Sequence, residues 1–216
     1  MGFMSIVQQI IGGFGTTVFI FFFTLLFSMP LGILFALARM SRFKPLNILM
    51  QFFISILRGT PLMLQLIVVF FMPYYVFGIK LTTSWRVYAA LIGFSINYAA
   101  YFGEIFRAGI QAVPVGQHEA AEVLGFTKVQ TFWKIVFPQM VKRVVPPVTN
   151  EVITLVKDTS MAFAIAYAEM FTMAKQVAAA QSNIMPLFVA GIFYYVFNIV
   201  VAWLMGKVEK SLDYFQ

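Results

Sequence analysis

Cysteine is absent from this chain of 216 residues, and histidine occurs once, at position 118. A disulfide framework and a thiolate metal site are therefore excluded. We also predict no metal site, because zinc would then need mostly carboxylate ligands. Charged residues make up only 11% of the chain, whereas 61% is hydrophobic and 18% is aromatic. Because soluble domains rarely have this balance, it predicts an integral membrane protein.

Motifs of common enzymes are also missing or incomplete. His118-Glu119-Ala120-Ala121-Glu122 begins like the zinc-protease motif H-E-x-x-H but lacks the second histidine. Neither a G-x-S-x-G nucleophile elbow nor the phosphate-binding motif G-x-x-x-x-G-K-[ST] occurs. We therefore expect no catalytic residues and no cofactor bound by this chain itself.

Long apolar stretches recur along the chain and predict about five membrane-spanning helices, at about 16–38, 46–79, 87–107, 144–167 and 185–205. Because the stretches are continuous rather than alternating, helices are favoured over a barrel. The expected fold is all-α, with one domain over 1–216. The second stretch exceeds one crossing, and we predict that Gly59-Thr60-Pro61 breaks or kinks it.

Lysine and arginine gather at the ends of these stretches rather than in one basic stripe. Arg39, Arg42 and Lys44 follow the first stretch, and the positive-inside rule places them in the cytoplasm. The N-terminus is then outside, and five crossings put the C-terminus inside. The net charge of +7 therefore indicates membrane topology and not a nucleic-acid partner.

One polar segment, at about 114–127, separates the third and fourth stretches. Pro114 is suited to open a short helix and Gly125 to close it. The side chains of Ala120, Ala121 and Leu124 are predicted to form a small apolar patch that fits a groove on another protein. A helix lying on the membrane surface is the alternative.

Several motifs resemble those of one family of membrane proteins. The spacing of Glu119-Ala120-Ala121, Gly125, Ile135 and Pro138 matches the "EAA" signature of permease subunits of binding-protein-dependent ABC importers, although Phe137 stands where the family usually has Leu. Three further motifs resemble its polar amino acid branch: Arg58-Gly59-Thr60-Pro61-Leu62 with Gln65, Glu104-Ile105-Phe106-Arg107 with Gly109-Ile110, and Lys157-Asp158-Thr159-Ser160. The resemblance covers essentially the whole chain.

The resemblance implies a type I ABC importer permease that moves a polar amino acid across the bacterial cytoplasmic membrane. A separate ATPase subunit would bind ATP and magnesium and would dock on the helix at 114–127. A second permease subunit, identical or homologous, and an extracellular or periplasmic solute-binding protein would complete the complex. The implied ATPase-coupling residues are Gly116, His118, Glu119, Ala120, Ala121, Leu124 and Gly125. A stand-alone secondary carrier or channel is the alternative.

Ionisable residues within the stretches suggest where a solute binds, because such groups normally face a cavity or a partner. Glu151 and Asp158 lie seven residues apart, nearly on one helical face. In the third stretch, helical spacing places Asn97, Tyr101 and Glu104 on one side. The candidate substrate-binding residues are Asn97, Tyr101, Glu104, Glu151, Asp158, Thr159 and Ser160.

A structural role is the alternative for several of these residues. Lys157 and Asp158 could form interhelical ion pairs, and Glu104 could pair with Arg107 one turn away. Arg58 is predicted to satisfy backbone carbonyls that the break sets free. The candidate structural residues are Arg58, Pro61, Lys157 and Pro138.

Overall fold

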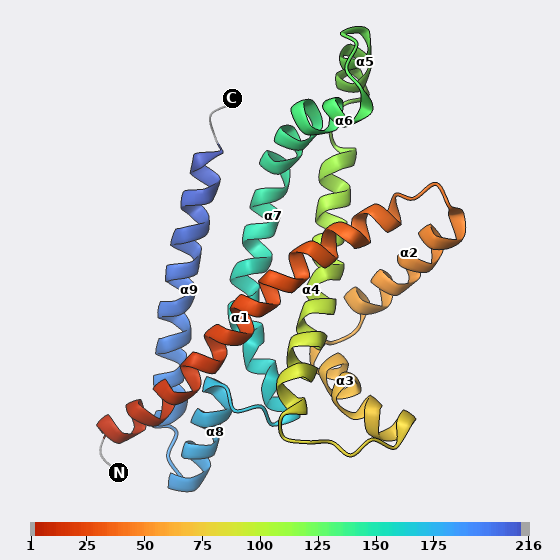
Figure 1. Ribbon diagram of the computed structural model, residues 1–216. Helices are drawn as coiled ribbons and strands as arrows, with labels where there is room; N and C mark the ends of the chain where they lie inside the picture. Colours follow the sequence, from red (N-terminus) through yellow and green to blue (C-terminus); the bar gives the residue numbers. More distant parts are fainter. Residues whose placement is uncertain (1–2, 213–216) are drawn as a thin grey trace.

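The computed structural model describes residues 3–212, and this part of the chain is helical, with no strand (Figure 1). Its long helices lie side by side in an elongated bundle, which confirms the predicted all-α class. In chain order the elements are α1 (Phe3–Arg39), α2 (Lys44–Gly59), α3 (Leu62–Phe77), α4 (Trp85–Gln111), α5 (Val115–Val123), α6 (Lys128–Thr131), the π-helix η1 (Phe132–Val136), α7 (Phe137–Asp158), the 3-10 helix η2 (Thr159–Ile165), α8 (Met170–Gln181) and α9 (Met185–Ser211).

Helix α4 forms the centre of the bundle, and α1 crosses it at close range (Figure 1). Two glycines permit this approach. A Cβ atom on Gly32 would lie 2.8 Å from the Cβ of Phe102, and one on Gly103 would lie 3.0 Å from the Cβ of Phe35. Small residues at such crossings let helix backbones approach closely in a membrane, where hydrophobic burial gives no advantage.

The second predicted stretch is broken, as expected, but far more sharply than a kink. The pair is bent by 111° between α2 and α3. Thr60 is extended, with φ −119° and ψ 150°, as the residue before a proline favours. Each arm has 16 residues and is about 24 Å long, so neither alone matches a hydrocarbon layer of about 30 Å.

Three helices of the described chain, α1, α4 and α9, are long and apolar enough to cross a membrane individually. The bent pair of α2 and α3 adds a fourth crossing if it forms one span. The predicted fourth stretch corresponds to α7 with η2. Helix α7 lies between α4 and α9 (Figure 1) but differs from α1, α4 and α9 in composition. It contains five charged residues, Lys142, Arg143, Glu151, Lys157 and Asp158.

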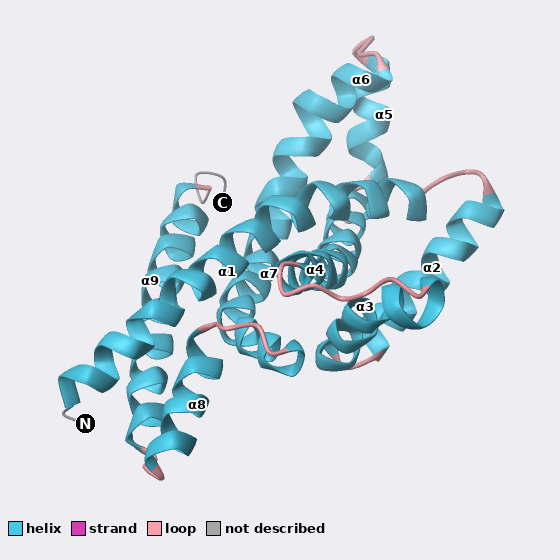
Figure 2. Ribbon diagram, turned by 60° about the horizontal axis from the view of Figure 1, so that its bottom comes forward, coloured by secondary structure: helices cyan, strands magenta, loops and turns pink. Residues whose placement is uncertain are grey.

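The structure adds two features that the sequence did not predict. Helix α1 begins at Phe3 rather than near residue 16, and α8 forms a short helix beside α1 and α9 (Figure 2). The buried Glu169 carboxylate caps α8 by accepting hydrogen bonds from the amides of Phe171 and Thr172, both at 2.7 Å. It also accepts the hydroxyl of Tyr194 in α9, at 2.8 Å. The two amide bonds are a local cap, whereas the bond from Tyr194 is tertiary, and apolar periodicity revealed neither.

Candidate functional site

A cavity of about 400 Å³ lies where α4, α7 and the break between α2 and α3 meet. Three segments supply its walls, and most of the side chains are polar. The lining residues are Thr60, Pro61, Leu62, Asn97, Tyr98, Tyr101, Glu151, Thr154 and Asp158. Four of the predicted substrate-binding residues, Asn97, Tyr101, Glu151 and Asp158, therefore come together here.

Side-chain amides stabilise the break that forms one wall of the cavity. The Gln65 amide nitrogen donates to the carbonyl of Leu57 at 2.8 Å and to the carbonyl and hydroxyl oxygens of Thr60 at 3.2 and 2.8 Å. Asn97 donates to the Gln65 side-chain oxygen at 2.9 Å and to the Leu57 carbonyl at 3.3 Å. The carbonyls of Leu57 and Thr60 at the break therefore have donors, as an apolar environment requires.

Arg58 has a different position from the one predicted. Amides rather than its guanidinium satisfy the freed carbonyls, because Gln65 and Asn97 already occupy them. The Arg58 guanidinium carbon instead lies 5.2 Å from the ring centroid of Tyr101, within cation–π range. Arg58 thus adjoins the cavity through one of its lining residues.

Two carboxylates form the acidic wall of the cavity, both from α7. Asp158 accepts a hydrogen bond from the hydroxyl of buried Tyr98, at 2.8 Å. Neither Asp158 nor Glu151 forms an ion pair within residues 3–212, where both ion pairs belong to Glu104. A carboxylate has about four acceptor sites. The wall therefore retains capacity for hydrogen-bond donors on a bound molecule.

The residues next to Asp158 in the chain, Lys157, Thr159 and Ser160, do not line the cavity. Lys157 is exposed, and neither Lys157 nor Asp158 forms an ion pair within residues 3–212, so the alternative of interhelical ion pairs is not observed there. Thr159 is buried and donates to the Val156 carbonyl at 2.7 Å, and Ser160 donates to the Lys157 carbonyl at 2.7 Å. Neither hydroxyl belongs to the cavity lining.

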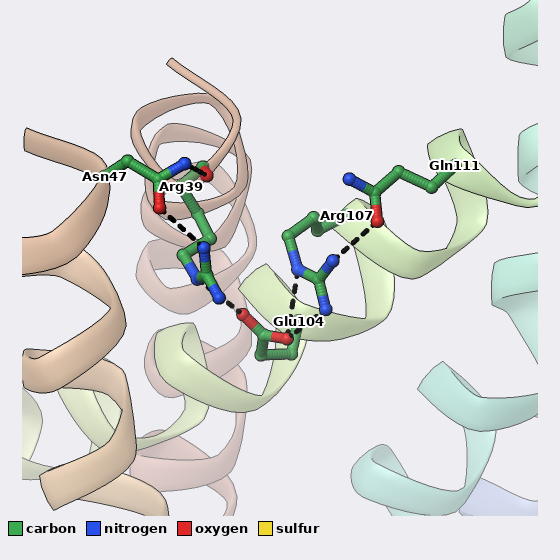
Figure 3. Close-up of polar contacts among 5 residues, drawn as sticks. All are labelled: Arg39, Asn47, Glu104, Arg107 and Gln111. Carbon is green, nitrogen blue, oxygen red and sulfur yellow. Dashed lines mark hydrogen bonds and ion pairs between the residues drawn. The ribbon is translucent and has the colours of Figure 1, made fainter. Parts of the chain in front are cut away.

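Glu104 lies outside the cavity, in a closed cluster of charges that Figure 3 shows. Its carboxylate pairs with Arg107 at 2.6 Å and with Arg39 from α1 at 3.7 Å. Arg107 also donates to Gln111 at 2.6 Å, and Arg39 donates to Asn47 of α2 at 2.7 Å. The cluster thus ties α1, α2 and α4 together, and the predicted pair of Glu104 with Arg107 is present.

Sequence reasoning included Glu104 and omitted Tyr98, for a geometric reason. Asn97, Tyr101 and Glu104 do share a face of α4, but Glu104 lies two turns, or about 10 Å, beyond Asn97 along the axis. Tyr98 is adjacent to Asn97 in sequence and points to the same cavity from the edge of that face. The sequence signal for Tyr98 was its position one helical turn before Tyr101 on the same span.

The polar segment at 114–127 contains α5. It lies at the end of the molecule that projects past the C-terminal end of α9 (Figure 1). Pro114 caps the N-terminus of α5, and Gly125 beyond its end has φ +76°, which favours glycine. Among the predicted coupling residues, most are exposed: Gly116, His118, Glu119, Ala120, Leu124 and Gly125. Ala121 is 1% exposed and packs inside the chain.

The exposed apolar surface of this end therefore differs from the predicted patch. It includes Leu124 of that patch together with Val115 and Val123, which are 73%, 70% and 88% exposed. Ala120 of the predicted patch is exposed as well. A π-helical turn, η1, connects this end to α7, and Pro138 is near the start of α7, where its missing amide is tolerated. Such π-turns are frequent at functional positions.

A polar, acid-walled cavity among the spans is an arrangement typical of transport proteins, in which ionisable groups inside the membrane mark solute or ion pathways. Residues 28–214 match the family described as "Binding-protein-dependent transport system inner membrane component". The chain belongs to this family and is a multi-pass inner-membrane transport permease.

Individual relatives and a solved structure resemble almost the whole chain. The arginine transport system permease protein ArtQ of Bacillus subtilis (strain 168) is 35% identical over 94% of this chain and 92% of its own length. The L-cystine transport system permease protein TcyB of the same organism is 35% identical over 94% and 86%. A structure described as an amino acid ABC transporter with histidines matches with a TM-score of 0.87, at 29% identity, covering 98% of this chain and 99% of the other.

Proposed function

We propose that this chain is the membrane-spanning subunit of an ATP-driven importer and that the cavity beside Glu151 and Asp158 binds the amino acid it moves. The observation that carries the proposal is the acidic wall, whose two carboxylates form no ion pair within residues 3–212 and which faces a polar break. A zwitterionic amino acid needs acceptors for its ammonium and donors for its carboxylate. Glu151 and Asp158 offer the acceptors, and the hydroxyls of Tyr101 and Thr154 offer donors.

The charge of the cavity favours a cationic or neutral amino acid. Two carboxylates line it and no lysine or arginine does, so a solute with a net negative charge would meet repulsion. Arginine and cystine, the solutes in the names of the two relatives, fit this requirement. Both are therefore suitable probes.

Energy would come from a separate ATPase subunit, which would bind ATP and magnesium. The exposed side chains of Val115, Val123 and Leu124 on α5 and its C-terminal cap support a docking role, because an apolar group projecting into water is best explained by a covering partner. This role places α5 in the cytoplasm. Since the C-terminal end of α9 lies on the same side as α5 and the N-terminus lies opposite, the proposed orientation has the N-terminus outside (Figure 1).

A second permease subunit, identical or homologous, would cover the outer face of α7. Asn150 and Lys157 are exposed there, although the helix lies among the spans. An amine facing hydrocarbon is costly, at about 2.5–3.5 kcal/mol, so a polar partner surface is favoured. A solute-binding protein on the outside would deliver the amino acid.

Uptake of radiolabelled arginine and cystine into vesicles tests the proposal, with the chain reconstituted beside its co-expressed ATPase. We expect uptake only with ATP on the ATPase side. Leu124→Asp should lower ATPase co-purification and uptake at least about tenfold, because the new charge must be desolvated on docking. The matched control, Ile79→Asp, changes an exposed apolar residue in the loop after α3 and should alter neither. Full uptake without ATPase or ATP would show a stand-alone carrier instead.

A further inference from the structure

A second polar cleft lies between α7 and α9, on the side of the molecule that carries α5. Its volume is about 290 Å³, and it shares no lining residue with the acid-walled cavity because it is built from the N-terminal half of α7. The lining residues are Lys142, Val145, Pro146, Glu209, Lys210 and Leu212. Figure 1 shows that α9 ends well short of α5. The cleft, at the C-terminal end of α9, therefore lies below the part of the chain that carries α5.

The residues just before the cleft in α9 mark the edge of a membrane. Trp203 is 58% exposed, and the ammonium of Lys207 lies 3.6 Å from its ring centroid. Tryptophan gathers at membrane–water interfaces, and lysine near a helix end extends toward the headgroups. Glu209 and Lys210 lie about two turns beyond Trp203, which is the depth of the lipid headgroups.

The cleft offers both cations and hydrogen-bond acceptors. Neither Lys142 nor Lys210 belongs to an ion pair within the described chain, and neither does Glu209. Pro146 has no amide hydrogen, so the helical donor that would reach the Lys142 carbonyl is missing. A ligand that suits this cleft therefore carries a negative group for the lysines and donor groups for the carboxylate and carbonyl.

An apolar track leads from the membrane side to the same cleft. Val200, Leu204 and Val208 are each spaced by four residues on α9 and are 47%, 50% and 44% exposed. The next residue of this series is Leu212, which lines the cleft. Residues four apart lie on one helical face. The track is therefore continuous with the polar cleft, as acyl chains are continuous with a headgroup.

We propose that this cleft binds a phospholipid whose headgroup joins an anionic phosphodiester to hydroxyl donors, as in phosphatidylglycerol. The phosphate lies between Lys142 and Lys210, the hydroxyls donate to Glu209 and the Lys142 carbonyl, and an acyl chain follows the α9 track. Basic clefts between spanning helices on one membrane face are suited to such headgroups. Phosphatidylcholine fits less well because its headgroup has no hydrogen-bond donor.

Fluorescence quenching of Trp203 by brominated lipids tests this proposal. The full chain with Trp85→Phe and Trp133→Phe retains Trp203 as its single tryptophan. In nanodiscs, brominated phosphatidylglycerol should quench it more strongly than brominated phosphatidylcholine. Lys142→Ala with Lys210→Ala should lower that preference about fivefold per lysine removed. The control pair Lys128→Ala with Lys134→Ala removes the same charge from the α6–η1 region and should leave the preference unchanged.

Three results of the quenching experiment would overturn the proposal. Equal quenching by the two lipids would remove the headgroup preference, and an equal loss in the control pair would show diffuse charge attraction. Displacement by inorganic phosphate at matched ionic strength would indicate a site for free phosphate. Native mass spectrometry of the unaltered chain provides a readout without the tryptophan changes. Retention of one more phosphatidylglycerol by the parent than by the cleft variant supports the proposal, and equal retention contradicts it.

Discussion

The acid-walled cavity and the Glu104 cluster both contain carboxylates and both adjoin α4, yet they differ in how those carboxylates are paired. In the cluster, one carboxylate is shared by Arg39 and Arg107, whose other donors reach Asn47 and Gln111. In the cavity, the two carboxylates form no ion pair within the described chain.

The difference teaches that an ionisable group inside a span is not by itself a binding residue. A charged group whose ion-pair and hydrogen-bond partners are supplied by neighbouring helices stabilises the arrangement of those helices. A carboxylate with open acceptor sites can instead bind a solute. Arg58 lies between the two regions, over the ring of Tyr101.

Asp158→Asn should produce the largest effect on the cavity. It removes the charge but keeps the shape, and hydrogen bonds to charged groups contribute about 1.5–3 kcal/mol. We therefore expect the affinity for arginine or cystine to fall about ten- to hundredfold in calorimetric titrations, with an unchanged melting temperature. A lower melting temperature with normal affinity would assign Asp158 to the structure instead.

Glu104→Gln should lower stability and leave solute affinity nearly unchanged, the reverse of the effect of Asp158→Asn. Arg39 and Arg107 would keep their charges without a carboxylate, and the free energy of unfolding should fall by about 1–3 kcal/mol. Thermal denaturation should therefore occur at a lower temperature, while solute affinity changes less than twofold. Gln111→Ala, at the exposed end of the same cluster, is the matched control and should change neither quantity. A loss of affinity in Glu104→Gln would place Glu104 in the solute site.

Tyr98→Phe should have the smallest effect of the three. It deletes the one hydroxyl that donates to Asp158 and leaves the buried ring in place. Since a net hydrogen bond contributes about 0.5–1.5 kcal/mol, solute affinity should change by about two- to tenfold in the same titration. No change would show that the hydroxyl does not position Asp158 for the solute.

Much of the site was predictable because helical spacing is short-range. Glu151 and Asp158 share a helical face because they are seven residues apart, and Gly59-Thr60-Pro61 predicted the break. The role of Gln65 was not predictable, since its amide reaches the Leu57 carbonyl across the bend that the break creates. The burial of Ala121 also depends on how the α5 end folds back on the chain.

The sequence by itself determined the membrane class, the helical fold, the break and the family, because each depends on composition or on residues near one another in the chain. Only the tertiary structure decided which charges are paired, since Arg39 and Glu104 belong to different helices. It also decided that α8 forms over the buried Glu169 and that a lysine-lined cleft opens between α7 and α9. Pairing requires contact in space, and one helix cannot specify the neighbours that its faces will meet.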